Sequence, residues 1–451
     1  MDRIREDSRE IELIGKYDIC VVGGGCTGVL AAVSAARLGA KVAIIENCGM
    51  FGGVATTSMV NIWHSRYDIT GGTKIIGGLT EEIIHRLGSR SAIMEHGERG
   101  NEVYAFNPAD LAIELDSLLI GAGVDPFLHT LFASPISENG TLAGVAVEDV
   151  SGRHAIGAEY FVDCTGDGSL IARMGLGTRK HEVIQPPTMC SLLQGLDEIR
   201  EIHPDFNIGR AAFDSKYEEA LPGGFLWSAD VTGLRDIRMV AGTRVAGSDC
   251  SEADQLTRAE MEGRRQVRAM CDILRKNFLP QGRNPLVCLA SKIGIRDTRH
   301  AECLHTLTER EVLRGKRFSD GIANGTYRVD IHLPDRPGVI FRYLDGREEL
   351  VGPHIHEQKR WLNEGEEAAR FYQIPYESLV PKGSKNILVA GRLVDADPGA
   401  YGAIRVMVNC NQTGEAAGTA SKIALDEGVP VSDVDPHKLR ETMKKQGSII
   451  V

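Results

Sequence analysis

The sequence lacks the features that mark several protein classes. Its ten cysteines stand singly, with neither a C-x-x-C pair nor the dense spacing of a disulfide scaffold. We therefore expect reduced, mostly buried thiols and no dithiol chemistry. No apolar run is long enough to cross a bilayer, and the N-terminal segment is charged, so we expect no membrane span and a cytoplasmic location.

Positive charge is also scarcer than negative charge. The 51 Lys and Arg residues face 62 Asp and Glu residues, which gives a net charge of −11. Such a balance opposes non-specific attraction to phosphate backbones or anionic lipid. We expect no nucleic-acid partner.

Glycine, in contrast, is abundant. The chain has 51 glycines, a hydrophobic fraction of 42% and a charged fraction of 25%, which is typical of a globular α/β protein. Its 451 residues exceed what one hydrophobic core usually fills. The length therefore predicts two domains, or one domain that carries a large insertion.

A dinucleotide-binding pattern stands near the N-terminus. The segment YDICVVGGGCTG reads as a strand that ends in G-x-G-x-x-G at Gly23, Gly25 and Gly28. An Ala-rich helical stretch closed by Gly39 follows, and then the strand KVAIIE, which ends at Glu46. An isolated G-x-G-x-x-G can be an ordinary glycine turn, but here the whole strand–helix–strand context is present.

The residue types of this pattern suit a dinucleotide. Glycines let the backbone approach a pyrophosphate, whose charge is stabilised by free N–H groups and the helix dipole. A carboxylate at Glu46 can accept hydrogen bonds from ribose hydroxyls but would repel a 2′-phosphate. The pattern therefore indicates FAD or NAD rather than NADP. A second flexible loop at Gly52 and Gly53, in FGGVATT, favours FAD.

Distant segments continue the same sheet. A helix from Asn107, its N-cap, to Ile120 precedes a predicted β-meander over 129–168 whose last strand, YFVDCTGDG, re-enters the nucleotide sheet. Near the C-terminus the strand NILVAG leads through a glycine-rich loop into a helix over 406–425, rich in Gly and Ala. This helix is either a tightly packed core helix or one that approaches a flat ring closely.

These pieces predict an α/β fold in which a Rossmann-like FAD-binding domain, with a parallel sheet and a β-meander, carries an inserted mixed α/β substrate or cap domain. The expected boundaries are 1–168 and 381–451 for the two parts of the FAD-binding domain and 169–380 for the inserted domain.

The motifs together resemble a known family. GGGCTG with Glu46, GGVATT, VDCTGDG, GIRDTRH, the Asp330–His332 triplet, and LVAGR through GEAAG resemble the FAD-dependent oxidoreductases of the glutathione-reductase-like, two-dinucleotide-binding superfamily. The resemblance implies that the flavin ring lies near the start of the last helix. The cofactor-binding residues it implies are Gly23, Gly25, Gly28, Glu46, Gly52, Gly53, Thr56, Phe132, Thr165, Gly166, Asp167, Gly391, Arg392, Arg405 and Gly414. Arg405 could instead contact phosphate or pair with Asp395.

Two residues are candidates for catalysis. Arg296, in GIRDTRH, could orient a substrate carboxylate or carbonyl, or form a structural salt bridge. His332 could exchange the proton that accompanies hydride transfer, or be a buried structural histidine. His64 could contact the flavin, even covalently, or it could contact only the residues that bind the flavin. His354 and His356 lack an evident third ligand, and no metal is assigned.

The leading functional hypothesis is an FAD-dependent oxidoreductase that moves a hydride between a small organic molecule and flavin N5. The alternatives are a non-redox FAD-binding or sensing protein and a flavin monooxygenase or halogenase-like enzyme. No second G-x-G-x-x-G has strand–helix–strand surroundings, so a dissociable substrate, a quinone or a partner protein would supply or accept the electrons. Homo-oligomerisation is left open.

Overall fold

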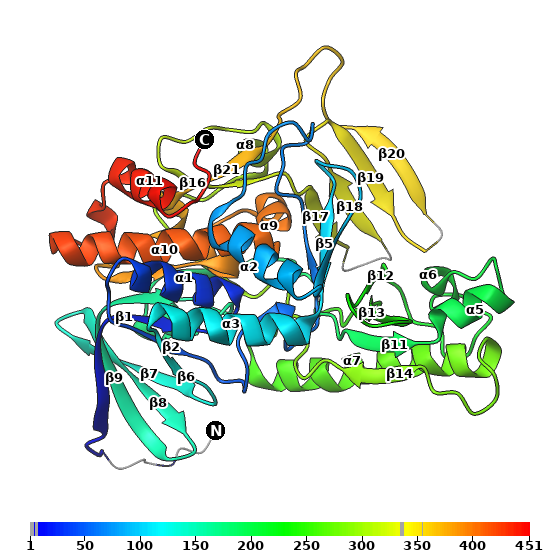
Figure 1. The fold of residues 1–451 in the computed structure, drawn as a ribbon, viewed down its shortest axis with the longest axis horizontal. Helices are drawn as coiled ribbons and strands as arrows, with labels where there is room; N and C mark the ends of the chain where they lie inside the picture. Colours follow the sequence, from blue (N-terminus) through cyan, green and yellow to red (C-terminus); the bar gives the residue numbers. More distant parts are fainter. Residues whose placement is uncertain (1–3, 5–7, 334–337, 354) are drawn as a thin grey trace.

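A seven-stranded sheet joins the two ends of the chain (Figure 1). The structure, a computed structural model, describes residues 4, 8–333, 338–353 and 355–451. The strands of this sheet are β1 (Glu12–Val22), β2 (Val42–Ile45), β6 (Asp125–Phe127), β7 (Leu131–Glu138), β8 (Thr141–Asp149), β9 (Gly152–Asp163) and β22 (Ile387–Val389). Strands β1, β2, β6, β9 and β22 pair in parallel, whereas β7, β8 and β9 form an antiparallel meander.

Strand β22 pairs with β9 from Ile387 opposite Phe161 to Val389 opposite Asp163. It thereby brings the C-terminal segment to the end of β9, next to the N-terminal strand β1. The predicted fold class, a parallel sheet with a β-meander assembled from both ends of the chain, is confirmed.

Three helices form a layer against this sheet: α1 (Cys26–Arg37), α3 (Pro108–Ala122) and α10 (Met407–Glu427), stacked one above another in Figure 1. The close approach of α10 to α1 explains its glycines. A Cβ on Gly414 would lie 2.2 Å from the carbonyl oxygen of Thr27, and one on Gly418 would lie 2.0 Å from that of Ala31. Larger residues cannot pack at these two positions.

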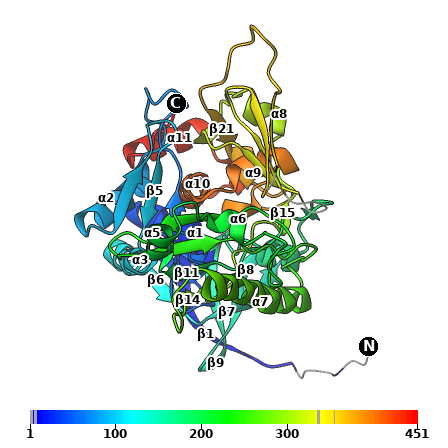
Figure 2. The ribbon, with the colours of Figure 1, turned by 90° about the vertical axis from the view of Figure 1, so that its right-hand side faces the viewer.

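A second part of the chain has its own core. Strands β11 (Ser191–Gln194), β12 (Trp227–Asp230), β13 (Ile237–Ala241) and β14 (Leu286–Leu289) form an antiparallel sheet in the order β12-β13-β11-β14. Helices α5 (Leu196–Ile202), α6 (Ile208–Ala211) and α7 (Ala253–Asn277) pack with it around buried residues such as Met189 and Val240. Figures 1 and 2 show the long helix α7 along the lower edge of this part.

Three arginines of α7 lie on its solvated face. Arg258, Arg264 and Arg265 pair with acidic residues three or four positions earlier on the same helix.

A third group of strands follows. Strands β17 (Val329–His332), β18 (Val339–Arg342), β19 (Arg347–Val351) and β20 (His356–Arg360) form an antiparallel sheet, and β16 (Gly321–Gly325) pairs with β21 (Tyr372–Pro375). Ile322 and Tyr372 share the hydrophobic core of α1 and α10. This group therefore packs directly on the nucleotide-binding sheet and its helices.

Shorter elements complete the fold. They are β3 (Ile62–Trp63), β4 (Ile93–His96), β5 (Val103–Phe106), β10 (Thr178–Lys180), β15 (Arg299–Ala301), α2 (Gly78–Ser89), α4 (Ser169–Met174), α8 (Glu309–Leu313), α9 (Pro398–Ile404), α11 (Pro436–Lys445) and the 3₁₀ turns η1 (Gly53–Ala55), η2 (Tyr376–Leu379), η3 (Gly391–Leu393) and η4 (Val431–Asp433). Among the described residues, no helix combines the length and the apolar character that a bilayer crossing requires.

Candidate functional site

One cavity connects these parts of the fold. It has a volume of about 740 Å³, within the range of small-molecule and cofactor sites. The predicted residues that line it are Gly23, Gly25, Glu46, Gly52, Gly53, His64, Phe132, Thr165, Gly166, Asp167, Arg296, His332, Gly391, Arg392 and Arg405. Residues from both ends of the chain and from its middle therefore meet at one site.

The glycine turn opens this cavity at the start of α1. Gly25 is the N-cap of the helix with φ −62° and ψ 172°, and a Cβ added to it would meet no atom within 4 Å. The first N–H groups of a helix lack intrahelical partners and carry the positive end of its dipole. The turn therefore combines free space with an electrostatic preference for an anion.

Gly28, Thr56 and Gly414 do not line the cavity. A Cβ on Gly28 would lie 1.9 Å from the carbonyl oxygen of Gly23, and Thr56 Oγ1 donates a hydrogen bond to the Phe51 carbonyl at 2.7 Å. Gly414 faces α1 instead. These three residues shape the turn, the second loop and the helix contact around the cavity, and their contact with a cofactor stays a prediction.

Glu46 is fixed at the end of β2. Its Oε2 accepts a hydrogen bond from the Gly24 amide and its Oε1 accepts one from the Cys48 amide, both at 2.8 Å. The carboxylate thus lies beside the glycine turn, where the sequence pattern placed it.

Asp163, which the sequence analysis missed, organises the end of β9. Its carboxylate accepts hydrogen bonds from the Thr165 amide and hydroxyl and from the Leu170 and Ile171 amides. Burial raises the pKa of Asp163 to about 6, although the Thr165 hydrogen bonds oppose the shift. The side chain therefore holds the Thr165–Asp167 turn at the wall of the cavity.

Arg392 and Arg405 come from the C-terminal segment. Gly166, at φ +77°, lies so close to Arg392 that a Cβ would be 2.3 Å from Arg392 Nη2. Arg405 Nη2 lies 3.3 Å from Asp330 Oδ1. The alternative pairing of Arg405 with Asp395 is wrong, because Asp395 pairs with Arg179 at 2.5 Å.

Arg296 reaches the cavity from the segment before β15. Its Nη1 donates to the Pro186 carbonyl at 2.7 Å and to Thr188 Oγ1 at 2.5 Å. Burial and the neighbouring Arg405 lower the pKa of Arg296 to about 10. Within the described part of the chain it has no carboxylate ion pair, so the structural salt bridge considered above is not found.

His332 lies in an arginine-rich environment. Burial, then Arg296 and Arg244, hold the pKa of His332 well below its ordinary value. Its Nδ1 accepts a hydrogen bond from Arg244 Nε at 3.3 Å, so the proton of the neutral ring is on Nε2, which faces Asp330 Oδ1 at 3.4 Å. This shift disfavours the charged ring in this environment, and the acid–base role of His332 stays a prediction.

His64 also lines the cavity, with its ring centroid 4.2 Å from that of Tyr327. Burial and the charge of Arg328 lower the pKa of His64 to about 3, which keeps the ring neutral. His356 is exposed on β20, and His354 lies outside the described residues.

A buried cluster that the sequence did not predict follows Arg296 directly in the chain. Asp297 lies between His181 Nδ1 at 3.2 Å and His300 Nε2 at 2.8 Å, and the two imidazole rings stack with centroids 4.1 Å apart. Burial would raise the pKa of Asp297, but the hydrogen bonds from the two histidines lower it. The three side chains could together contact a metal ion, but each already has a hydrogen-bond partner in the cluster.

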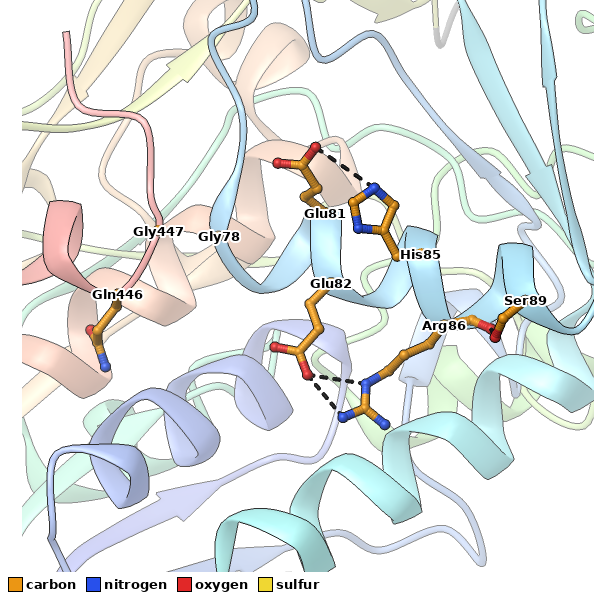
Figure 3. Close-up of a pocket in the computed structure, with 8 residues that line it drawn as sticks. All are labelled: Gly78, Glu81, Glu82, His85, Arg86, Ser89, Gln446 and Gly447. Atoms are coloured by element: carbon orange, nitrogen blue, oxygen red, sulfur yellow. Dashed lines mark hydrogen bonds and ion pairs between the residues drawn. The ribbon is translucent and has the colours of Figure 1, made fainter.

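A second hollow, of about 500 Å³, lies between α2 and the residues after α11 (Figure 3). Its charged residues pair along α2: Glu82 with Arg86 at 2.9 Å and Glu81 with His85 at 3.9 Å. These are ordinary helix-surface pairs, so the larger cavity is the better candidate for a functional site.

The residues of the large cavity fit a flavin dinucleotide. Gly25 leaves room at a helix N-terminus, Glu46 stands at the end of the second strand, and Arg392 Nη1 and Arg405 Nε are buried without a hydrogen-bond partner among the described residues. Buried cationic groups of this kind normally contact an anion. The fold and the site thus define a Rossmann-type dinucleotide-binding protein.

Comparison with known proteins identifies the family. The model of the FAD dependent oxidoreductase family matches residues 18–443. The chain belongs to this family, and it is an enzyme that uses FAD.

Individual relatives match only in part. A digeranylgeranylglycerophospholipid reductase from Methanoculleus marisnigri is 31% identical over 219 residues, which are 47% of this chain and 52% of that protein. A dihydrolipoyl dehydrogenase from Trypanosoma brucei brucei is 29% identical over an alignment of 206 residues that covers 36% of this chain and 42% of that protein. The chain spans about half the length of the curated relatives it matches.

Among solved structures, a geranylgeranyl bacteriochlorophyll reductase-like protein from Thermoplasma acidophilum superposes with a TM-score of 0.48 at 14% identity. The superposition covers 96% of this chain and 83% of that one.

Proposed function

We propose that the protein oxidises or reduces a small organic molecule by hydride transfer between that molecule and N5 of FAD bound in the large cavity. The observation that carries this proposal is the continuity of the cavity. The same space is lined by Gly25 and Glu46 of the nucleotide turn and by Arg296 and His332 of the middle segment. A cofactor and a substrate can therefore lie side by side there.

We propose that the cavity-lining residues identified from the sequence hold the cofactor. The open space at Gly25 suits a diphosphate, Glu46 suits ribose hydroxyls, and the unpartnered nitrogens of Arg392 and Arg405 suit negatively charged groups. The start of α10 opens on the same cavity through Met407, and its dipole would stabilise negative charge on a reduced ring.

On the substrate side, we propose that Arg296 orients the reacting molecule. Its peptide carbonyl accepts a hydrogen bond from the Tyr401 hydroxyl at 2.5 Å, which fixes the segment that carries it. His332 contributes a neutral ring that is held by Arg244 and Asp330. We propose that the neutral ring of His332 forms hydrogen bonds in the reaction, rather than that it acts as a charged imidazolium near neutral pH.

We further propose that 1–168 and 381–451 form the FAD-binding domain and that 169–380 forms the substrate or cap domain. The pairing of β22 with β9 supports the first grouping, and the separate core around Met189 supports the second. The glutathione-reductase-like superfamily is the proposed wider relationship, supported by the parallel sheet with its meander. Because the sequence has one dinucleotide fingerprint, we propose a dissociable donor or acceptor of electrons.

The test is anaerobic reduction of the purified, FAD-loaded protein by a panel of organic donors, followed by the visible absorption of the flavin. We expect at least one donor to bleach the spectrum and Arg296→Gln to slow that bleaching. A protein that binds FAD but is reduced by no donor, and whose chemically reduced flavin passes electrons to no organic acceptor, would contradict the proposal and favour a sensing role. Oxygen consumption coupled to NAD(P)H would favour a monooxygenase.

A further inference from the structure

Positive charge gathers where β17 borders the cavity. Arg296, Arg328 and Arg405 line this end of the cavity, and the buried Arg244 lies directly behind His332. The one carboxylate that β17 contributes to the lining is Asp330, which already receives the Tyr327 hydroxyl at 2.8 Å and faces Arg405. The other lining carboxylates, Glu46 and Asp167, belong to the nucleotide turn and the end of β9.

Arg328 differs from the other three arginines in its surroundings. Its guanidinium lies over aromatic rings, 4.1 Å from the centroid of Phe341, 5.2 Å from that of Tyr327 and 5.4 Å from that of Tyr343. Its Nε is buried without a hydrogen-bond partner, and no carboxylate of the described ranges forms an ion pair with it. The planar group is thus held in place by stacking while its hydrogen-bond donors stay available.

Within the described part of the chain, Glu349 attracts Arg328 electrostatically but forms no ion pair with it. Glu349 on β19 accepts the Tyr343 hydroxyl at 2.9 Å and faces Arg347 at 3.7 Å. The other arginines are also committed: Arg244 donates to His332, Thr188 and two carbonyls, and Arg296 donates to Thr188 and Pro186. Arg405 also has a free Nε, but it is ion-paired with Asp330 at 3.3 Å. Among the described residues, Arg328 is therefore the guanidinium of this cluster that has neither an ion pair nor a hydrogen bond and has donors to offer to a ligand.

The walls around this end are apolar and aromatic. Phe225 and Trp227 from the β11–β14 sheet side face the cavity together with Tyr327 and Phe341, and the rings of Phe225 and Phe341 meet edge to face at 6.0 Å. Flat, largely apolar walls favour a ligand with a planar or hydrocarbon body. A partly buried guanidinium that has no ion pair among the described residues favours an anionic head on that ligand, because a poorly solvated charge without a partner is costly.

We propose that this end of the cavity binds the carboxylate of a small aromatic or otherwise apolar acid, and that Arg328 receives that carboxylate. The inference rests on the proposed function, since it names the substrate class of the same cavity. A planar guanidinium can meet a carboxylate with two parallel hydrogen bonds, which fixes the orientation of the acid as well as its position. Arg296 and Arg405 would add attraction from the adjacent walls.

The test uses the FAD-loaded protein and three probes: benzoate, phenylacetate and trans-cinnamate, each compared with its neutral amide. Binding is measured by calorimetry and by the shift of the flavin absorption bands. We expect the acids to bind at least about 10-fold more tightly than the amides, and Arg328→Gln to weaken acid binding about 10- to 100-fold, the usual range for a lost hydrogen bond to a charged group. Arg328→Lys keeps the charge but not the planar donor pair, so its affinity for the acids should lie between those of the wild type and Arg328→Gln.

Arg347→Gln is the matched control. Arg347 stacks on the same Tyr343 ring at 4.4 Å, but it is paired with Asp345 and lies outside the cavity lining. It should leave acid binding unchanged. Equal binding of acids and amides, or wild-type binding by Arg328→Gln, would overturn the proposal.

The two proposals fail separately. If organic donors reduce the flavin but no acid probe binds, the substrate class is wrong and the oxidoreductase proposal stands. If the acids bind through Arg328 but no donor or acceptor exchanges electrons with the flavin, the anion site stands and the proposed reaction is wrong. The comparison of acids with amides needs no variant, so it decides the question even if Arg328→Gln does not fold.

Discussion

Gly25 and Gly28 belong to one turn but should respond differently to the same added methyl group. Gly25 has φ −62° and ψ 172°, which alanine adopts freely, and an added Cβ meets nothing within 4 Å. The free energy of unfolding of Gly25→Ala apoprotein should therefore change by less than about 1 kcal/mol. In Gly28→Ala the Cβ would lie 1.9 Å from the Gly23 carbonyl oxygen, and we expect a loss of about 1–3 kcal/mol.

Gly25→Ala, the milder substitution for the stability of the apoprotein, should be the more severe one for FAD binding. The open space beside Gly25 is the cavity at the N-terminus of α1, where we place the FAD diphosphate. A methyl group there would hold the diphosphate away from the backbone. One lost hydrogen bond to a charged group costs about 1.5–3 kcal/mol, so FAD affinity should fall about 10- to 100-fold per bond.

Two measurements on apoprotein separate the effects. Urea unfolding followed by tryptophan fluorescence gives stability, and quenching of FAD fluorescence on titration gives affinity. The reasoning is refuted if Gly25→Ala binds FAD as tightly as the wild type, or if it loses as much stability as Gly28→Ala.

Four further substitutions test burial, packing and capping in helices α10 and α3. Burial raises the pKa of Glu415 from 4.5 to about 7. The stability that the protonated carboxyl contributes is therefore present below pH 4.5 and is lost as the pH rises to about 7. Glu415→Gln should stabilise the protein by up to about 3 kcal/mol in urea unfolding at pH 8 and by little at pH 4.5. Gly418→Ala should lower stability by about 1–3 kcal/mol, since its Cβ would lie 2.0 Å from the Ala31 carbonyl oxygen. Gly121→Ala, in open space on α3, should instead raise stability by about 0.5–1 kcal/mol. Thermal unfolding measures both effects. Asn107→Ala removes the side chain that accepts the Ala109 amide at the start of α3 and should cost about 1 kcal/mol in the same assay; an unchanged melting temperature would show that this cap is not stabilising.

The nucleotide half of the site could be predicted because its signals are local. The strand, glycine turn, helix and acid from Tyr17 to Glu46 follow one another in the chain, and each residue type has one physical reason to stand there. The cap at Asn107 is equally local, and it is confirmed. The pattern also predicted that the last strand, NILVAG, joins the same sheet, and it does. Its neighbour was not predicted: we expected it beside the first strand, whereas β22 pairs with β9, more than 200 positions earlier.

The substrate half could not be predicted to the same depth. The pKa of His332 depends in part on Arg244, which lies 88 positions earlier. No sequence pattern near His332 predicts that contact. Asp297 acts through a cluster that forms only when His181, 116 positions earlier, meets it. The hydrogen bonds of Asp163, in contrast, are local, since they come from Thr165, Leu170 and Ile171. One signal was available: Arg328, just before β17, alternates with Asp330 and His332 on that strand, and alternate residues share a face. All three line the cavity.

The most direct test of the account is a crystal structure of the protein with FAD bound. We predict the diphosphate at the start of α1 beside Gly25, the adenosine ribose at Glu46, and the flavin ring between the start of α10 and the Arg296–Arg328 end of the cavity. A structure with the dinucleotide away from the glycine turn, or with the ring outside this cavity, would contradict the account.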